Sequence, residues 1–127
     1  MGAPAIVMGD KITGMCPNHL MIGPLGAPIP SPPLPFSAPI TSGTVATVLI
    51  GGKPAAVAGS SGMNTPPHVG LHASDPFLAP PTELGNIVSG SPTVMIGGTP
   101  AATAQSTCTC CVAPGTLLPS VVTVLIG

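Results

Sequence analysis

Charged side chains are nearly absent from this sequence. Its 127 residues include two Lys, three acidic residues and no Arg, whereas about a quarter of the residues in an ordinary soluble domain are charged. So few cations cannot neutralise a phosphate backbone, and we expect no nucleic-acid partner. Much of the surface must be uncharged.

Large aromatic residues and long apolar segments are also scarce. The chain has no Trp or Tyr and only two Phe, so its core must be built from aliphatic side chains that each bury little area. No run approaches the ~20 apolar residues of a membrane helix. The N-terminus lacks the basic segment of a signal peptide, and we therefore expect synthesis in the cytoplasm without one.

Proline and glycine are abundant instead. The 19 Pro and 17 Gly are typical either of a disordered chain or of a β fold rich in turns. A chain that is 44% hydrophobic and almost uncharged does not have the composition of a disordered one. Helix signals are nearly missing, with room for a turn or two near residues 82–86. We predict a single all-β domain over residues 1–127.

Three near-copies of one unit recur along the chain. Two are continuous, at about residues 41–60 and 87–106, and share the pattern Thr-Val-Leu/Met-Ile-Gly-Gly-x-Pro-Ala-Ala. The third is split between the termini, with its first half at 119–127 and its second at 3–10. A β-branched strand, a Gly-Gly turn and a returning strand form a β-hairpin. Three such hairpins would close a ring of approximate threefold symmetry and bring the termini together.

A proline-rich segment lies between the half-repeat at 3–10 and the continuous repeat at 41–60. Residues 24–39 include Pro-Ile-Pro-Ser-Pro-Pro-Leu-Pro, a pattern that favours extended polyproline II. It could serve as a ligand for an SH3-type domain, but we favour a rigid wrapping segment.

All His and Cys residues follow the returning strands of the hairpins. They are Cys16, His19, His68, His72, Cys108, Cys110 and Cys111. Threefold geometry would make these groups converge, and thiolate with imidazole is the donor set that Zn²⁺ prefers. Two alternatives stay open: buried thiols with loop histidines and no metal, or a disulfide formed after export.

A structural metal site is favoured over a catalytic one. A catalytic zinc needs an open coordination position and a nearby carboxylate, for which Asp10, Asp75 and Glu83 are the candidates. Asp10 more plausibly accepts backbone hydrogen bonds in a turn, as Ser60 and Ser106 could at the equivalent positions. We therefore expect no enzymatic activity; the alternative is a zinc-dependent hydrolase or metal-binding protein.

The repeats resemble the PAAR-repeat proteins of contractile injection systems. The likeness is carried by Ile-Gly-Gly-Lys-Pro-Ala-Ala-Val at 50–57, by Ile-Gly-Gly-Thr-Pro-Ala-Ala-Thr at 96–103 and by Pro-Ala-Ile-Val-Met-Gly-Asp at 4–10. Val57 and Thr103 stand where the family motif has Arg, and Gln105-Ser106 replaces Gly-Asp. The resemblance implies a small β cone.

The resemblance also implies a metal site and a role. The family's zinc is typically held by three His and one Cys, which implies His19, His68, His72 and Cys110 here, with Cys108, Cys111 and Cys16 as the next thiolate candidates. The implied function is a non-enzymatic tip that caps a trimeric β-helical spike, one copy per trimer, and helps to pierce a target membrane. Delivery into or across a target envelope, with possible effector cargo, would follow, in a type VI secretion or phage-tail-like machine.

Overall fold

The fold is all-β, as predicted. The computed structural model describes residues 2–17, 19–65, 67–79, 82–111 and 113–126. Helical geometry in the described residues is confined to short 3₁₀ turns, of which the longest is η1 (Pro24–Gly26). None of the described helices is long or apolar enough to cross a membrane.

Three antiparallel hairpins form one end of the molecule. They pair β6 (Val45–Ile50) with β7 (Lys53–Ala55), β10 (Met95–Ile96) with β11 (Thr99–Pro100), and β14 (Leu125–Ile126) with β1 (Ala3–Pro4). The third hairpin joins the two ends of the chain, as predicted from the split repeat. Gly51 and Gly97 both have φ of 60°, and Gly52 and Gly98 both have φ of 82°, the left-handed pair that a two-residue hairpin turn requires.

A closed ring of hydrogen bonds relates the three repeats. The amide of Ile6 donates to the carbonyl of Ala102 at 3.1 Å, Ala102 donates to Ala56 at 3.0 Å, and Ala56 donates to Ile6 at 2.9 Å. These residues occupy the same position in each repeat. The cycle returns to its start after three steps, which is the approximate threefold symmetry that the repeats predicted.

Each repeat ends in the same capped turn. The side chain at the last position accepts a hydrogen bond from the amide three residues earlier, in the pairs Asp10 with Val7, Ser60 with Val57, and Ser106 with Thr103. Asp10 also accepts from the amide and hydroxyl of Ser120. The predicted turn role of Asp10 is confirmed, and its carboxylate ties the two halves of the split repeat together.

A six-stranded antiparallel sheet extends from the hairpins. From edge to edge its strands are β5 (Leu34–Pro39), β2 (Lys11–Cys16), β13 (Ala113–Leu118), β12 (Cys108–Cys110), β9 (Leu84–Ile87) and β8 (Ser61–Met63). The two edge strands curl toward each other, and Thr41 after β5 donates its amide to Ser61 of β8. A Cβ on Gly62 would lie 2.0 Å from the carbonyl oxygen of Pro39. Glycine at 62 is therefore what lets the sheet nearly close.

The proline-rich segment is part of this architecture, and its predicted polyproline conformation was wrong. It contains η1, β4 (Pro28–Pro30), which pairs with β3 (Leu20–Ile22), and the edge strand β5, which pairs with β2. An edge strand tolerates Pro because its backbone has a neighbouring strand on one side only, so an N–H on the other side is not needed for hydrogen bonding in the sheet. The helical turns allowed near residues 82–86 are likewise replaced, over most of that range, by β9.

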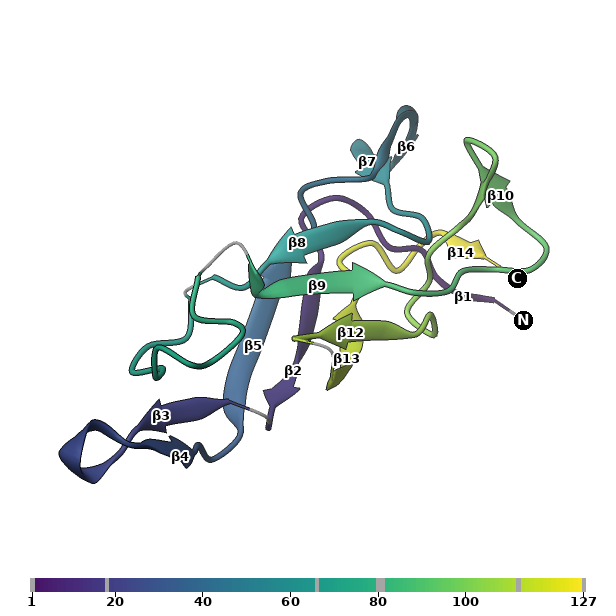
Figure 1. Ribbon diagram of the computed structural model, residues 1–127. Coiled ribbons are helices and arrows are strands. Elements are labelled where there is room, and N and C mark those ends of the chain that lie inside the picture. Colours follow the sequence, from purple (N-terminus) through teal and green to yellow (C-terminus); the bar gives the residue numbers. More distant parts are fainter. Residues whose placement is uncertain (1, 18, 66, 80–81, 112, 127) are drawn as a thin grey trace.

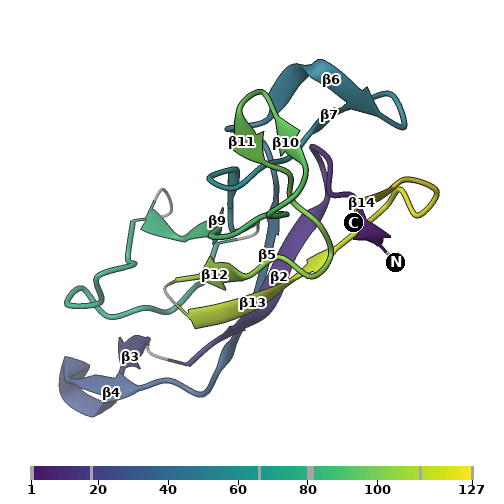
Figure 2. The ribbon, with the colours of Figure 1, turned by 90° about the vertical axis from the view of Figure 1, so that its right-hand side faces the viewer.

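The elements are arranged along one long direction. The hairpin end, made of β1, β6, β7, β10, β11 and β14, lies at one extreme with both termini, and the β3–β4 hairpin projects at the other (Figures 1 and 2). The sheet lies between them. One apolar cluster, including Val7, Ile50 and Ile96, fills the hairpin end, and another, including Ile12 and Phe36, fills the sheet.

Candidate metal centre

Four metal-ligating side chains meet where the sheet ends, on the side away from the hairpins. Cys16 is the last residue of β2, His19 precedes β3, His68 lies between β8 and β9, and Cys111 follows β12. One nitrogen or sulfur atom from each lies within 4.8 Å of the other three. The ends of β2 and β12, which are separated in the sheet only by β13, and two loops thus bring two thiols and two imidazoles together.

The ring of His19 is held in a defined orientation. Its Nδ1 lies 3.1 and 3.3 Å from the two carboxylate oxygens of Asp75. Because a carboxylate accepts, Nδ1 carries the proton in the neutral ring, and the lone pair available to a metal ion is then on Nε2. Nε2 is buried and has no hydrogen-bond partner among the described residues. An orphaned buried nitrogen beside two thiols and another imidazole is the donor that a metal ion would satisfy.

Asp75 is itself held in place by backbone hydrogen bonds and so fixes the ring of His19. Its carboxylate also accepts the amides of Leu20 and Phe77, each at 2.7 Å. Burial alone would raise the pKa of Asp75, but the two amides and the imidazole outweigh it and hold the pKa below its usual range. The carboxylate is therefore ionised at neutral pH and fixes the tautomer of His19.

His68 reaches the same centre from the loop between β8 and β9. Its ring packs edge-on against that of His19, with centroids 4.5 Å apart, and its Nε2 lies 3.9 Å from the Cys111 sulfur. Burial lowers the pKa of His68, and the nearby Glu83 carboxylate offsets this only in part. The imidazole is therefore neutral at neutral pH, the form that ligates metals.

The two thiols are protonated while no cation is bound. Burial, followed by the neighbouring Cys111, raises the pKa of Cys16 to about 12. Burial likewise raises the pKa of Cys111 to about 11. A metal ion supplies the positive charge that would stabilise both thiolates, and its binding would release two protons. Every cysteine is free in the structure.

A second buried carboxylate borders the centre. Glu83 is fully buried, and its Oε1 accepts hydrogen bonds from the amide of His68 at 2.9 Å and from Asn64 Nδ2 at 3.0 Å. The same oxygen lies 3.7 Å from His68 Nε2. Its other oxygen has no hydrogen-bond partner among the described residues. Glu83 thus fixes the loop that carries His68.

His72, which the resemblance implied as a ligand, lies outside this group. Its Nε2 donates to the carbonyl of Gly26 at 2.8 Å, and its Nδ1 accepts from the amide of Ser74 at 3.1 Å. Both ring nitrogens are therefore engaged. The side chain joins the loop after β8 to the end of the β3–β4 hairpin.

Cys110, the implied thiolate, also lies outside the group. It is completely buried in the sheet core, where a Cβ on Gly14 would come within 2.8 Å of its sulfur. Cys108, two residues earlier, is buried on the same face of β12. Cys111 follows the strand with a φ of +46°, which turns it out of the strand alternation.

Strand alternation could have indicated this arrangement. In Cys-Thr-Cys-Cys, period two assigns Cys108 and Cys110 to the core face, which leaves Cys111 as the thiol at the strand's end. His19 and His68 are brought together as the repeat phase implied. The centre therefore has two Cys and two His. Its thiols, Cys16 and Cys111, are the two that the family resemblance placed last among the thiolate candidates. No sequence signal marked Asp75 as the partner of His19.

The donor set determines what the centre can do chemically. Two thiolates and two imidazoles provide four donors, enough to complete a tetrahedral site without an open position. Buried walls and a carboxylate-oriented histidine are features of a site that holds an ion in place. The arrangement can hold one metal ion as a link between β2, β12 and the loop after β8.

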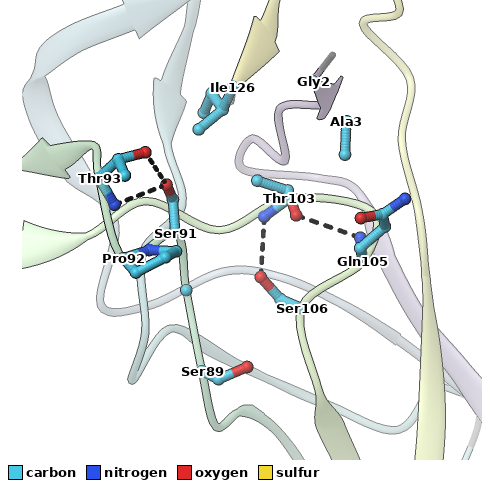
Figure 3. Close-up of a pocket in the computed structure, with 11 residues that line it drawn as sticks. Gly2, Ala3, Ser89, Ser91, Pro92, Thr93, Thr103, Gln105, Ser106 and Ile126 are labelled. Carbon is cyan, nitrogen blue, oxygen red and sulfur yellow. Dashed lines mark hydrogen bonds between the residues drawn. The ribbon is translucent and has the colours of Figure 1, made fainter.

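A separate hollow at the hairpin end offers no comparable chemistry. A cavity of about 560 Å³ opens between the segments around Ser91 and Thr103, beside Ile126 of β14 (Figure 3). Its hydroxyl groups cap turns, since Ser106 Oγ accepts from the amide of Thr103, and Thr103 Oγ1 accepts from that of Gln105. The described lining residues include no titratable side chain.

The comparisons with known proteins agree with the ring of repeats. The sequence model of the PAAR motif family matches residues 35–113, more than half of the chain. The protein belongs to the PAAR motif family. The match spans the two continuous hairpins, β6–β7 and β10–β11, and fits a spike-tip role in contractile injection systems. No curated protein and no solved structure matches the chain.

Proposed function

We propose that this PAAR protein is a non-enzymatic tip that caps the trimeric β-helical spike of a contractile injection machine. The observation that carries the proposal is the closed threefold ring of Ile6, Ala56 and Ala102. A single chain with three equivalent sectors can present the same contact to each subunit of a trimer. One copy per trimer is the stoichiometry that this symmetry favours.

The hairpin end has an apolar surface suited to such docking. Leu49, Met95 and Leu125 occupy the same position in the three hairpins and are exposed by 61%, 58% and 58%. Exposed apolar side chains that repeat by symmetry are typical of an interaction surface. We infer that these three side chains pack on the end of the spike, with the metal centre directed away from it.

Within this proposal the metal is a structural Zn²⁺ ion. Cys16, His19, His68 and Cys111 would hold it, in place of the set with His72 and Cys110 implied by the family resemblance. A zinc site of this kind can contribute on the order of 10 kcal/mol to folding. That contribution would stabilise a chain with few large core side chains against the load of penetration.

The proposal includes a path for the protein. It would be made in the cytoplasm, assembled on the particle with any effector cargo, and driven into or across the target envelope as the machine contracts. The end opposite the hairpins would meet the membrane first.

A zinc-dependent hydrolase is the second candidate, favoured by one observation. Glu83 presents a buried carboxylate oxygen beside His68 that has no hydrogen-bond partner among the described residues, as a general base would. Four protein donors leave no position for a metal-bound water, however. The closed donor set therefore supports the structural role better.

Co-expression with the trimeric spike protein of the same machine tests the proposal. We expect the two proteins to co-purify, and the triple variant L49N/M95N/L125N to lose the association. The matched control is Leu78→Asn, the same change from apolar to polar at an exposed leucine that lies outside the three hairpins. Association that survives the triple variant, or that is lost equally in the control, would contradict the proposed docking surface.

A further inference from the structure

Apolar side chains are exposed at the end of the molecule opposite the hairpins. The distal hairpin comprises β3, η1 and β4, residues 20–30, and it projects beyond the sheet (Figures 1 and 2). Ile22, Leu25 and Ile29 are exposed there, and so is Val69 on the adjoining loop. An isolated bridge between Met21 and Leu71 attaches that loop to the hairpin.

Leu25 is fully exposed at the end of this hairpin in an unfavourable backbone conformation. Its φ of 59° and ψ of 20° are left-handed, which costs a non-glycine residue about 1–2 kcal/mol. Gly or Asn would fit the position more easily. An exposed leucine in such a strained conformation points to a use for the apolar side chain itself.

The backbone of the distal hairpin is largely satisfied from within. Pro24, Pro28 and Pro30 have no N–H to donate. The amide of Gly23 donates to Ala27 at 2.7 Å, and those of Gly26 and Ala27 donate back to Gly23 and Pro24 at 3.1 and 3.3 Å. Internal satisfaction of backbone donors is the main requirement for entering hydrocarbon.

The same prolines make a protein partner less suitable. A peptide that added a strand to β4 would need backbone donors along its edge. Of Pro28, Ile29 and Pro30, only Ile29 has an N–H. The edge is thus unable to form the ladder by which extended chains are usually recognised.

Charge is absent from this end of the surface. Asp10, Asp75 and Glu83 are all buried, and no Lys, Asp or Glu occurs between Lys11 and Lys53. Those two lysines lie at the start of β2 and in β7, toward the hairpin end. The distal hairpin therefore meets no desolvation penalty from ionised side chains of its own.

We propose that the distal hairpin inserts into the acyl-chain region of a lipid bilayer, with Leu25 as its leading side chain. This proposal rests on the proposed function in that it assigns the membrane-contacting element of the tip. His72, bonded to the carbonyl of Gly26, would hold the hairpin against the loop that carries Val69. The metal centre would lie behind the inserted residues and stabilise their support.

An intrinsic fluorophore tests the insertion directly. The chain has no Trp or Tyr, so the full-length variant Leu25→Trp has a single reporter. The matched control is Val88→Trp, at a residue that is 60% exposed and directly follows β9, outside the distal hairpin. Each would be mixed with vesicles of phosphatidylcholine, and with vesicles of phosphatidylethanolamine and phosphatidylglycerol, with and without brominated acyl chains.

We expect the Leu25→Trp emission to shift to shorter wavelength and to be quenched by the brominated lipids, equally in both compositions and at low and high salt. The control should do neither. Leu25→Asn, which suits the left-handed backbone, should lower vesicle partitioning of the unlabelled protein by roughly ten- to a hundredfold. Ile29→Trp replaces Leu25→Trp if that variant does not fold.

Four results would overturn the proposal. The first two are no shift in Trp emission for either Leu25→Trp or Ile29→Trp, and equal quenching of the Val88→Trp control. The third is an emission shift that requires the anionic lipid. The fourth is a shift that appears without vesicles as the protein concentration rises, because that shift would indicate a second copy of the chain as the occupant. Spike association is measured separately. Leu25→Asn should still co-purify with the spike, so loss of lipid binding and loss of spike docking can be told apart.

Discussion

Replacing Cys111 by Ala should remove one of the four donors of the metal centre. Its sulfur lies within 4.8 Å of the other donor atoms. Loss of a donor should lower metal affinity by at least about 100-fold, because even outer partners of metal ligands account for 10- to 100-fold. At saturating metal, a 100-fold loss corresponds to about 2.7 kcal/mol of stability, or roughly 10 °C in Tm for a domain of this size.

Cys110→Ala is the matched control for this prediction. Cys110 is also fully buried, so its truncation should cost about 1–2 kcal/mol through lost packing. The two variants therefore both destabilise the protein, and only the response to metal separates them. The measurement is the Tm of each variant with zinc and with a chelator, together with bound zinc per chain.

The expected result is a metal-dependent Tm in the wild type and in Cys110→Ala, and none or a much smaller one in Cys111→Ala. His72→Ala should retain the metal response as well, because both ring nitrogens of His72 have other partners. A metal response that is lost in Cys110→Ala or His72→Ala but kept in Cys111→Ala would refute the ligand set argued from the geometry.

Three further predictions concern protons, anchoring and packing. Because Cys16 and Cys111 have pKa values raised to about 12 and about 11, both thiols are protonated at neutral pH when no metal is bound. Zinc binding would then release two protons, so zinc affinity should rise by about two log units per pH unit between pH 7 and 9, measured by chelator competition. Asp75→Asn should lower zinc affinity by about 10- to 100-fold in the same assay while Asp10→Asn does not. Gly62→Ala should lower the free energy of unfolding by about 3 kcal/mol or more, measured by thermal unfolding, because its Cβ would meet the Pro39 carbonyl oxygen at 2.0 Å. Gly52→Ala is the control: it has open space around it and should lower the free energy of unfolding by only about 1–2 kcal/mol.

The hairpin end could be predicted from the sequence because its information is local and repeated. Each continuous copy contains a β-branched strand followed by Gly-Gly, and the segments at 50–57 and 96–103 align without a gap. The ring then follows from symmetry, as the hydrogen bonds of Ile6, Ala56 and Ala102 confirm. Even the split third copy was recognisable, since both of its halves match the other repeats.

The six-stranded sheet could not be predicted in the same way. Strand β5 reads Leu-Pro-Phe-Ser-Ala-Pro, and its prolines favour polyproline II over a strand when the chain is considered alone. Its pairing with β2 is a long-range contact that supplies the hydrogen bonds and leaves the proline side at the edge. Tertiary pairing thus overrides local preference.

The metal centre was partly predictable for a related reason. Repeat phase locates the segments that converge, and His19 and His68 lie in two of them. Strand alternation assigns Cys108 and Cys110 to the core face, but the position of Cys111 also depends on its positive φ, which no local pattern specifies. The choice of His68 over His72 depends on the carbonyl of Gly26, which is supplied by a hairpin that the sequence did not predict.

The mass of the complex between this protein and its trimeric spike tests the central claim most directly. Native mass spectrometry of the co-purified pair should give one copy of this chain per spike trimer, because a single chain already supplies three equivalent hairpins. Three copies per trimer, or no complex at all with the spike from the same machine, would contradict the claim that the hairpin ring is the docking end of a spike tip.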